Sequence, residues 1–343
     1  MDFDLDAGQR LLAEVARDYL AAKCPLEADS PPPPWSELAG LGWCEPGPDG
    51  ADQAVLAEEL GYGLCAGPWF STVGLALPAY RAAGMAPSGP KTLAWLDDRT
   101  RSLREAANGS GCELARQGGA RLTGVKHAVP NAAEADAVVV TALGPDGVEL
   151  VAADLDAPGV RIEPQDTVDG TRPLSTVRFD DVPVVGLVEG GETVLAEIRQ
   201  RALTLLAAEA IGVGRRALDI AVGHASTRVQ FGRPIGVHQA ISHRLAEVYQ
   251  RVQLGRSLVF RAAIAEDDNA AAMALVAAAE AAVFACEAAI QTLGGAGFGW
   301  DHPLHRLYRR AQAAARFEGS LTEHRVEIGA AVLAGTEWGT TDD

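Results

Sequence analysis

The stretch RVQFGRPI, residues 228–235, lies between two long amphipathic patterns and indicates how the C-terminal part of the chain folds. Apolar residues recur at helical spacing over 198–224 before it and over 241–265 after it. Gly232 and Pro234 end the first pattern, and a second helix is expected to begin shortly afterwards. The two patterns therefore predict long helices joined by a sharp connection.

Arg228, the first residue of this stretch, has two interpretations. An arginine at the end of a helix can cap carbonyl groups or lie in solvent. Alternatively, its planar guanidinium is placed to grip a phosphate or diphosphate, with Phe231 as a flat platform beside it. The stretch taken alone leaves both interpretations open.

The chain divides into three zones along its sequence. Residues 1–90 show helical patterns with breaks, and we expect an N-terminal helical domain. Residues 91–190 contain short β-rich runs, such as 137–141, separated by turn signals, which predicts a small middle β barrel or sandwich. Residues 191–343 are helical and rich in alanine, notably over 269–293, which favours a helical bundle. The expected fold is therefore mainly α with a central β domain.

The composition excludes several classes of protein. A length of 343 residues suits about two domains with complete hydrophobic cores. Hydrophobic residues at 48% and charged residues at 22% are typical of a globular protein. The net charge of -17 repels phosphate backbones, so no nucleic-acid partner is expected. We also expect no apolar run of the roughly 20 residues that a membrane span needs and no leader segment, which predicts a cytoplasmic protein.

Neither disulfides nor metal ions are expected to hold the fold. The five cysteines are scattered without a CxxC pair, which argues against a disulfide framework and against a zinc site. His302 and His305 are three residues apart, a spacing that can bind metal, but the intervening Pro303 and Leu304 favour a surface or packing role. No metal ligand is predicted.

Two further segments contain residues that suit a ligand. The segment QTLGGAGF, residues 291–298, ends the third helical pattern with a glycine cluster, where backbone approaches a ligand closely. Glycine is also the commonest C-terminal cap of a helix, so this signal is weak by itself. The segment RFEGSLT, residues 316–322, places Glu318 between an aromatic residue and a glycine ahead of the last helix. Taken alone, such a carboxylate is solvated or is a charge at a helix N-terminus.

Taken together and in this order, the three segments resemble the C-terminal signatures of the acyl-CoA dehydrogenase family. The matching patterns are Arg-x-Gln-Phe-Gly-x-Pro-Ile, Gln-x-x-Gly-Gly-x-Gly-Phe and aromatic-Glu-Gly-Thr/Ser. The interval between the second and third matches the family without a gap. Weaker similarities, such as 122–126, extend the resemblance over nearly the whole chain. It implies an N-terminal helical domain, a middle β domain and a C-terminal four-helix bundle, assembled as a tetramer.

The resemblance implies FAD-dependent α,β-dehydrogenation of an acyl-CoA thioester, in lipid or sterol catabolism, with electron-transfer flavoprotein as the acceptor. A carboxylate base removes the α proton, and Glu318 aligns with one of the two known positions for that base. FAD would lie at a dimer interface. The residues that align with FAD-binding positions are Arg228, Gln230, Phe231, Gln239, Gln291, Gly294, Gly295, Ser320 and Thr322.

The middle domain departs from the family pattern. Family members have a Thr-Glu-Pro-Gly-type loop ahead of the β strands, and the corresponding stretch 105–119 lacks it. Where the family places a Trp and then a Thr or Ser beside the flavin ring, this chain has Ala128 and Pro130. Alanine does not cover a ring, and proline has no backbone donor. The residues expected to hold a partner's FAD are kept, whereas those that cup the ring within the same subunit are lost.

This asymmetry favours one subunit of a heteromeric enzyme, similar to the shorter subunit of bacterial α2β2 acyl-CoA dehydrogenases of sterol side-chain breakdown. Three alternatives stay open. The chain is a self-sufficient homotetramer that uses Glu318, or a non-catalytic structural subunit that completes the flavin site of a companion acyl-CoA dehydrogenase. The third is a flavin-free relative that binds CoA thioesters, which leaves Arg228 and the glycine cluster without a role.

Overall fold

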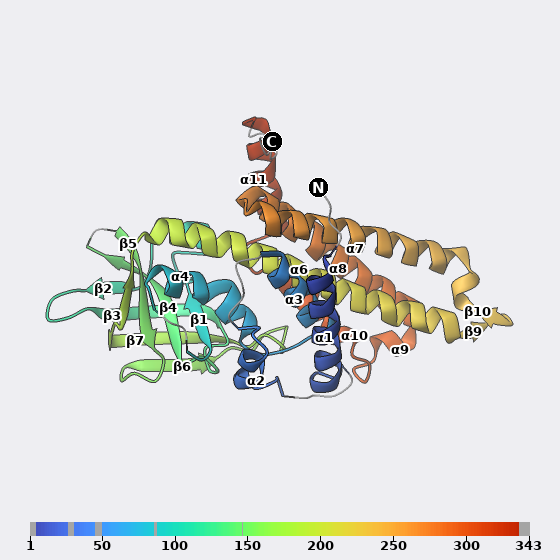
Figure 1. Ribbon diagram of the computed structural model, residues 1–343, viewed down its shortest axis with the longest axis horizontal. Helices are drawn as coiled ribbons and strands as arrows, with labels where there is room; N and C mark the ends of the chain where they lie inside the picture. Colours follow the sequence, from blue (N-terminus) through green and yellow to red (C-terminus); the bar gives the residue numbers. More distant parts are fainter. Residues whose placement is uncertain (1–4, 27–30, 45–49, 86–87, 146, 336–343) are drawn as a thin grey trace. The chain divides into compact units, whose positions relative to one another are not determined.

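In the computed structural model, the chain forms two compact units (Figure 1). The structure describes residues 5–26, 31–44, 50–85, 88–145 and 147–335. The helical unit comprises residues 1–32, 47–65 and 203–343, and the mixed unit comprises residues 33–46 and 66–202. The N-terminal helices are divided between the two units, and helix α6 (Gly191–Thr227) continues from the mixed unit into the helical unit without a break.

Long helices that pack along one another form the helical unit. They are α1 (Ala7–Lys23), α3 (Gly50–Tyr62), the larger part of α6, α7 (Gln239–Ala265), α8 (Asp268–Leu293), α10 (Leu304–Ala314) and α11 (Leu321–Leu333), with the short α9 (Gly295–Phe298). Helices α7, α10 and α11 all pack on α8, whose buried residues are mostly alanine. Small side chains let the helix axes approach, and the predicted helical bundle is confirmed.

Helices α3 and α6 touch at two glycines. A Cβ atom at Gly61 would lie 2.1 Å from the carbonyl oxygen of Glu209, and one at Gly212 would lie 1.9 Å from the carbonyl oxygen of Glu58. Both distances are far below van der Waals contact, so neither position accepts a side chain unless a backbone moves. The two glycines therefore set how closely α3 and α6 approach.

A buried group of charges fastens α3 to its neighbours. Glu58 and Glu59 are each only 2% exposed. Glu58 accepts a hydrogen bond from Arg256 Nε at 2.9 Å and also pairs with Arg215. Glu59 accepts from Arg17 Nε at 2.9 Å and from Arg215 Nη1 at 3.1 Å. Three guanidinium groups thus compensate two buried carboxylates, an arrangement in which loss of one partner strands a charge.

The mixed unit combines a curved sheet with short helices. Its elements are α2 (Trp35–Gly40), the π-helical η1 (Phe70–Ala76), α4 (Leu77–Ala82), β1 (Lys91–Ala94), α5 (Leu103–Ala106), β2 (Glu113–Ala115), β3 (Arg121–Pro130), β4 (Ala137–Gly144), β5 (Gly147–Asp154), β6 (Val160–Pro164), β7 (Leu174–Pro183) and β8 (Gly186–Val188). The strand order is β6-β7-β3-β2-β4-β5-β8, and β1 pairs with β4 in parallel.

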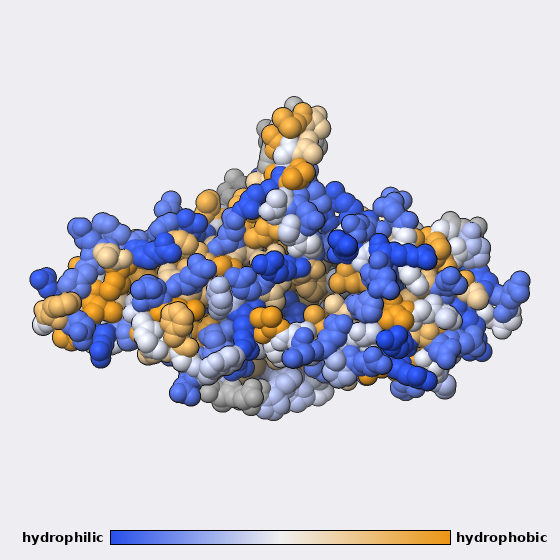
Figure 2. All heavy atoms as spheres, turned by 180° about the vertical axis from the view of Figure 1, so that it is seen from behind, coloured by the Kyte–Doolittle hydropathy of each residue, from blue (hydrophilic) through white to orange (hydrophobic). Residues whose placement is uncertain are grey.

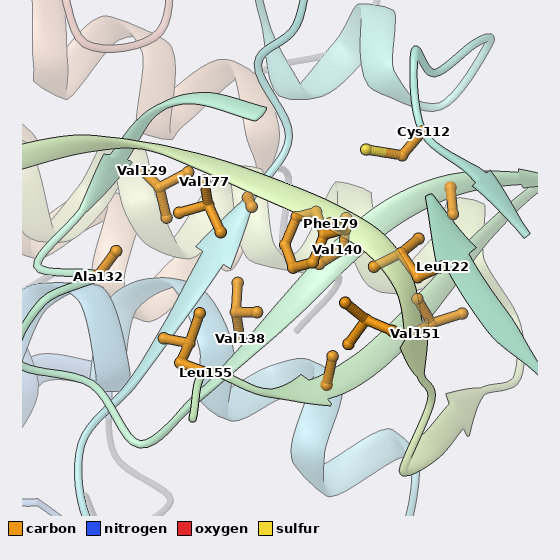
Figure 3. Packing of buried hydrophobic residues seen from close by; sticks show 14 of the residues in the cluster. Cys112, Leu122, Val129, Ala132, Val138, Val140, Val151, Leu155, Val177 and Phe179 are labelled. Carbon is orange, nitrogen blue, oxygen red and sulfur yellow. The ribbon is translucent and has the colours of Figure 1, made fainter. Parts of the chain in front are cut away.

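The hydrophobic core of the mixed unit gathers between these strands (Figure 3). Val138, Val140, Val151 and Val177 are fully buried, and Phe179 is 3% exposed. Residues 137–142 of β4 are all buried, although only Val138, Val140 and Ala142 belong to this core, so both faces of this part of β4 are covered. Such a continuous apolar run differs from the alternation of a half-exposed strand. The predicted middle β domain is confirmed.

Helix α8 is long and apolar enough to cross a membrane by length and composition, so the expectation that no segment reaches this limit is wrong. Its most apolar window is 61% buried inside the protein. Because α7, α10 and α11 cover it, α8 has the surroundings of a core helix of the bundle. Length and hydropathy alone do not separate these two kinds of helix.

Helix α11 projects from the rest of the helical unit, where it packs on α8 (Figures 1 and 2). Arg325 on α11 forms an ion pair with Glu280 on α8. Apolar side chains are exposed along α11, with Val326 at 68% and Leu333 at 90%, and Figure 2 shows this apolar surface on the projection. Much of the apolar surface of this helix is therefore left uncovered.

Candidate functional site

A tight hairpin joins α6 to α7. Strand β9 (Val229–Gln230) pairs antiparallel with β10 (Arg233–Pro234). Phe231 and Gly232 form the turn between them, with φ values of +53° and +79°. Positive φ at both central positions gives the turn the twist that a two-residue hairpin needs. Phe231 is 92% exposed, and its ring centroid lies 6.2 Å from that of His238, with the two rings perpendicular.

Arg228 precedes this hairpin with an exposed side chain. Its carbonyl oxygen accepts the N–H of Ile235 at 2.9 Å, which closes the base of the hairpin. No ion pair with another residue in the described part of the chain occupies its guanidinium. Gln230 on β9 and Gln239 at the start of α7 are exposed as well. These polar groups face outwards and are available to a ligand.

The glycine cluster ends α8 at the same end of the helical unit (Figure 1). Gly294 has a φ of +61°, which favours glycine on conformational grounds. At Gly294 and Gly295 a Cβ atom would meet no atom within 4 Å, so open space lies in front of this backbone. Gln291, one turn earlier on α8, is also exposed. A bulky ligand has room to approach the backbone here.

These observations test whether the residues fit the diphosphate of a dinucleotide. The exposed guanidinium of Arg228 offers a donor fork, Phe231 offers a flat apolar face, and the two glycines leave open space in front of the backbone. The donor set suits a phosphate-bearing aromatic ligand. The structure brings the hairpin and the glycine cluster to one end of the unit, as the sequence interpretation requires (Figure 1).

Glu318 lies in a different segment, the turn between α10 and α11, and is only 4% exposed. The interpretation of Glu318 as a solvated carboxylate is therefore excluded. Ser320 caps the N-terminus of α11: its hydroxyl accepts the N–H of Glu323 at 3.2 Å, and its own N–H donates to Glu323 Oε2 at 2.6 Å. Thr322 is exposed on the first turn of α11. The hydroxyl of Ser320 thus has a structural task within the capping box.

Strand β3 carries the two positions where the family places residues beside the flavin ring. Ala128 has a φ of +49° at an irregularity between Lys126 and Val129. A large side chain is disfavoured in this left-handed conformation. Pro130 is buried, and its carbonyl oxygen accepts the hydroxyl of Thr92 at 2.6 Å. The backbone conformation at Ala128 is therefore consistent with a small residue at the position where the family places one that covers the flavin ring.

A buried lysine organises the neighbouring loop, and its partners were not predicted from the sequence. Lys126 Nζ is fully buried and donates to Asp97 Oδ2 at 2.6 Å, to Thr141 Oγ1 at 2.8 Å and to Ser110 Oγ at 3.0 Å. Burial acts to raise the pKa of Asp97, but hydrogen bonds from Lys126 and from the N–H groups of Gly111 and Arg99 outweigh it and lower this pKa to about 2. One sequence signal indicated that Lys126 is buried: in a strand it lies on the same face as Leu122, an apolar residue.

The hydrogen-bond donors of the turn 110–112 bind acceptors within the mixed unit. The hydroxyl of Ser110 donates to the carbonyl oxygen of Thr141 at 2.7 Å, and the N–H of Gly111 donates to Asp97 Oδ2 at 2.8 Å. The N–H of Cys112 donates back to Ser110 Oγ at 3.1 Å. This turn belongs to the stretch 105–119, which replaces the Thr-Glu-Pro-Gly-type loop. Donors that are engaged in this way are not available to a ligand.

Comparisons with known proteins identify the family. Residues 191–333 match the model of the acyl-CoA dehydrogenase C-terminal domain. Acyl-CoA dehydrogenase IpdE2 of Mycolicibacterium smegmatis is 32% identical to this chain over 82% of the chain and 79% of its own length. The chain belongs to the acyl-CoA dehydrogenase family, whose enzymes are FAD-dependent oxidoreductases that act on CH–CH donors.

Two solved structures extend the similarity to nearly the whole chain. A variant of the Tcur3481–Tcur3483 steroid ACAD has a TM-score of 0.84 and 27% identity, over 96% of this chain and 98% of that chain. The ChsE4–ChsE5 complex from Mycobacterium tuberculosis has a TM-score of 0.83 and 25% identity, over 97% of this chain and 99% of that chain. Each of these names joins two proteins.

Proposed function

We propose that the chain is one subunit of a heteromeric FAD-dependent acyl-CoA dehydrogenase that acts on a steroid-derived acyl-CoA thioester. The similarity to the Tcur3481–Tcur3483 steroid ACAD supports the substrate class. The similarity to the ChsE4–ChsE5 complex supports a companion chain. A cytoplasmic location and electron-transfer flavoprotein as the electron acceptor belong to the same proposal.

The helical unit supplies the nucleotide side of the proposed site. Arg228 binds the diphosphate through its donor fork, and Gln230, Gln239 and Gln291 add neutral donors around it. Phe231 covers an apolar face of the cofactor. These side chains are exposed and open outwards, so they suit a flavin whose remaining contacts come from a companion subunit. Ser320 and Thr322, close to Glu318 in the sequence, are the other two residues that we assign to flavin contacts.

The single observation that carries the heteromeric assignment is the internal use of the turn 110–112. Its hydroxyl and backbone donors bind Asp97, Thr141 and one another rather than face a ligand. Together with Ala128 at positive φ, this leaves no uncommitted donor among these groups of the turn 110–112 and no ring-covering side chain at position 128 for a flavin bound by the same subunit. A subunit built in this way completes a companion's flavin site and depends on the companion for the reaction.

The reaction needs a base that is shielded from water. The α proton of a thioester is weakly acidic, so a carboxylate must hold its proton-accepting atom in a dry place beside the substrate. FAD, when bound, accepts the β hydrogen as hydride. In the proposed heteromer, the companion's carboxylate performs this proton transfer. Glu318 then stays buried as a remnant of the family's base position.

One observation favours a second candidate, the homotetramer that uses its own base. Glu318 is only 4% exposed, and its position matches the family's base. Burial provides the dry surroundings that such a base needs. In this alternative the mixed unit must bind a flavin without the usual ring-covering residue.

The visible spectrum of the purified chain separates the two candidates. We expect the chain expressed alone to be colourless, and the chain co-expressed with its companion acyl-CoA dehydrogenase subunit to be yellow. Extracted flavin should then amount to fewer than one molecule per polypeptide, because only one kind of interface binds it. A chain that is yellow when expressed alone, with one flavin per polypeptide, would contradict the heteromeric proposal and support the homotetramer.

A further inference from the structure

Two cysteines from distant parts of the sequence meet in the helical unit. Cys24 and Cys65 are 41 positions apart, and their Sγ atoms lie 3.5 Å from each other in hydrogen-bond contact. Cys24 follows α1, and its N–H donates to the carbonyl oxygen of Leu20 at 2.7 Å. Cys65 follows α3, and its N–H donates to the carbonyl oxygen of Leu60 at 2.9 Å. Because α1 and α3 pack together, two helix ends hold these thiols side by side.

We propose that Cys24 and Cys65 are a thiol oxidation site, and that they form a reversible disulfide when the protein meets a peroxide. A disulfide has an S–S length of about 2.05 Å, so the sulfurs must move about 1.5 Å closer. Both cysteines lie just outside the helices α1 and α3, and rotation about their Cα–Cβ bonds is the movement that the crosslink requires. This site goes beyond the proposed function, and none of the residues assigned to flavin or substrate takes part in it.

The surroundings of the two thiols assign them different roles. The hydrogen bond from Cys65 stabilises the thiolate of Cys24 and lowers the pKa of Cys24, which is also the more exposed of the two. The same hydrogen bond, together with burial, raises the pKa of Cys65 well above its ordinary value. The thiolate is the reactive form of cysteine. Cys24 is therefore the thiol that attacks the peroxide, and Cys65 is the thiol that then attacks the oxidised Cys24 to form the disulfide.

The chemistry balances with one peroxide per disulfide. The Cys24 thiolate attacks one oxygen of hydrogen peroxide, the O–O bond breaks, and the departing hydroxide takes a proton to become water. The sulfur of Cys24 is then a sulfenic acid. The sulfur of Cys65 attacks it, the S–O bond breaks, the S–S bond forms, and a second water leaves with the thiol proton. Two thiols lose two electrons in total, and the peroxide gains them.

The other cysteines of the chain lack this combination. Cys44, Cys112 and Cys286 are buried. Burial raises the pKa of Cys112 to about 11 and also raises the pKa of Cys286. High pKa and burial both protect a thiol from oxidation. Peroxide is therefore directed to the pair at the ends of α1 and α3.

The disulfide would join α1 to a segment that hydrogen bonds already connect to other helices. The carbonyl oxygen of Cys65 accepts from Arg310 Nη2 at 3.1 Å, and Arg310 Nε donates to the buried Glu209 of α6 at 2.8 Å. A disulfide therefore ties α1 to a segment that is bound to α6 and α10. The oxidised protein should melt at a higher temperature than the reduced protein, and dithiothreitol should reverse the difference.

Mass spectrometry of the full-length protein tests the proposal. The reduced protein is treated with a small excess of hydrogen peroxide, remaining thiols are alkylated, and the chain is cleaved after glutamate. Glu37 and Glu59 separate Cys24, Cys44 and Cys65 into different peptides. We expect a peptide pair linked through Cys24 and Cys65, two mass units lighter than the two thiol peptides together, which disappears on reduction.

Variants assign the roles of the two thiols. In Cys65→Ser, the resolving thiol is missing, so Cys24 should accumulate as sulfenic and sulfinic acid and react with a sulfenic-acid probe. Cys44→Ser is the matched control and should form the Cys24–Cys65 link as the wild type does. Over-oxidation of Cys24 to the same extent in the wild type and in Cys65→Ser, without a linked peptide, would overturn the proposal. None of these readouts depends on flavin, so failure here is distinct from failure of the proposed function.

Discussion

Lys126 is a fully buried cation of the mixed unit, and its Nζ donates to four oxygen atoms, which belong to the side chains of Asp97, Ser110 and Thr141 and to the carbonyl group of Trp95. Lys126→Met keeps most of the side-chain volume but leaves the Asp97 carboxylate buried without its cation. Breaking a buried ion pair from one side costs about 3–5 kcal/mol of unfolding free energy. Urea unfolding followed by circular dichroism measures this loss.

Lys91→Met is the control for this change. Lys91 lies in the same unit and is nearly buried, but its ion-pair partner Asp136 is exposed, so a charge left behind there stays hydrated. Its loss should cost less than that of Lys126. Equal losses in the two variants would contradict the special role of the Lys126 cluster.

The guanidinium of Arg228 is exposed and forms no ion pair within the described residues, so its replacement should leave folding intact. Arg228→Ala should lower flavin affinity more than tenfold, because each hydrogen bond to a charged group contributes about 1.5–3 kcal/mol. Flavin retained after dialysis, in whichever assembly binds it, is the measurement. Arg233→Ala removes the same charge from the same hairpin and should have a much smaller effect. Full retention in Arg228→Ala would rule out the assignment.

Glu318 distinguishes the two candidate functions. Glu318→Gln keeps the shape of the buried side chain and removes its ability to accept a proton. In the heteromer we expect nearly unchanged turnover, because the companion supplies the base. In a homotetramer the rate should fall by about 10²–10⁴-fold, as for loss of a general base. Anaerobic bleaching of the flavin by a panel of acyl-CoA thioesters measures the rate.

Helix packing in the bundle depends on backbone contact as well as on apolar side chains. Gly212→Ala should destabilise the protein by at least about 2 kcal/mol, because the added methyl group meets the carbonyl oxygen of Glu58. Gly223→Ala is the matched control on the same helix: it is exposed, and its Cβ meets nothing within 4 Å. This control should gain about 0.5–1 kcal/mol from the higher helix propensity of alanine. Similar thermal shifts of the same sign in both variants would contradict the packing explanation.

Most elements could be predicted from local pattern. The sequence periodicity placed the helices at 241–265 and 269–293, and the structure has α7 at Gln239–Ala265 and α8 at Asp268–Leu293. The β-rich run 137–141 became the start of β4. The π-helical η1 was not predicted, because a π-helix has no distinct periodicity signal in so short a segment. The parallel pairing of β1 with β4 was not predicted, because it joins segments that are distant in sequence.

The assembled molecule should be an oligomer. Helix α11 exposes Val326, Val332 and Leu333, an apolar surface on a projecting helix (Figure 2). Phe298 and Trp300 are also exposed, at a separate place next to α9 (Figure 1). Large exposed apolar surface commonly marks a protein interface. Multi-angle light scattering at micromolar concentration should therefore report a dimer or tetramer, alone or with the companion, and a single species of 35.8 kDa would contradict this.

The sequence by itself determined the family, the order of helical and β-rich regions and the three motifs, because these depend on residue type and spacing along the chain. The tertiary structure decided which of those residues face outwards and which are used internally. It placed the β9–β10 hairpin and the glycine cluster at one end of the helical unit, buried Glu318, and engaged Ser110 and Gly111 with the Lys126 cluster. Many hydrogen bonds, and the contact between Cys24 and Cys65, join segments that are distant in sequence. Only folding brings such segments together.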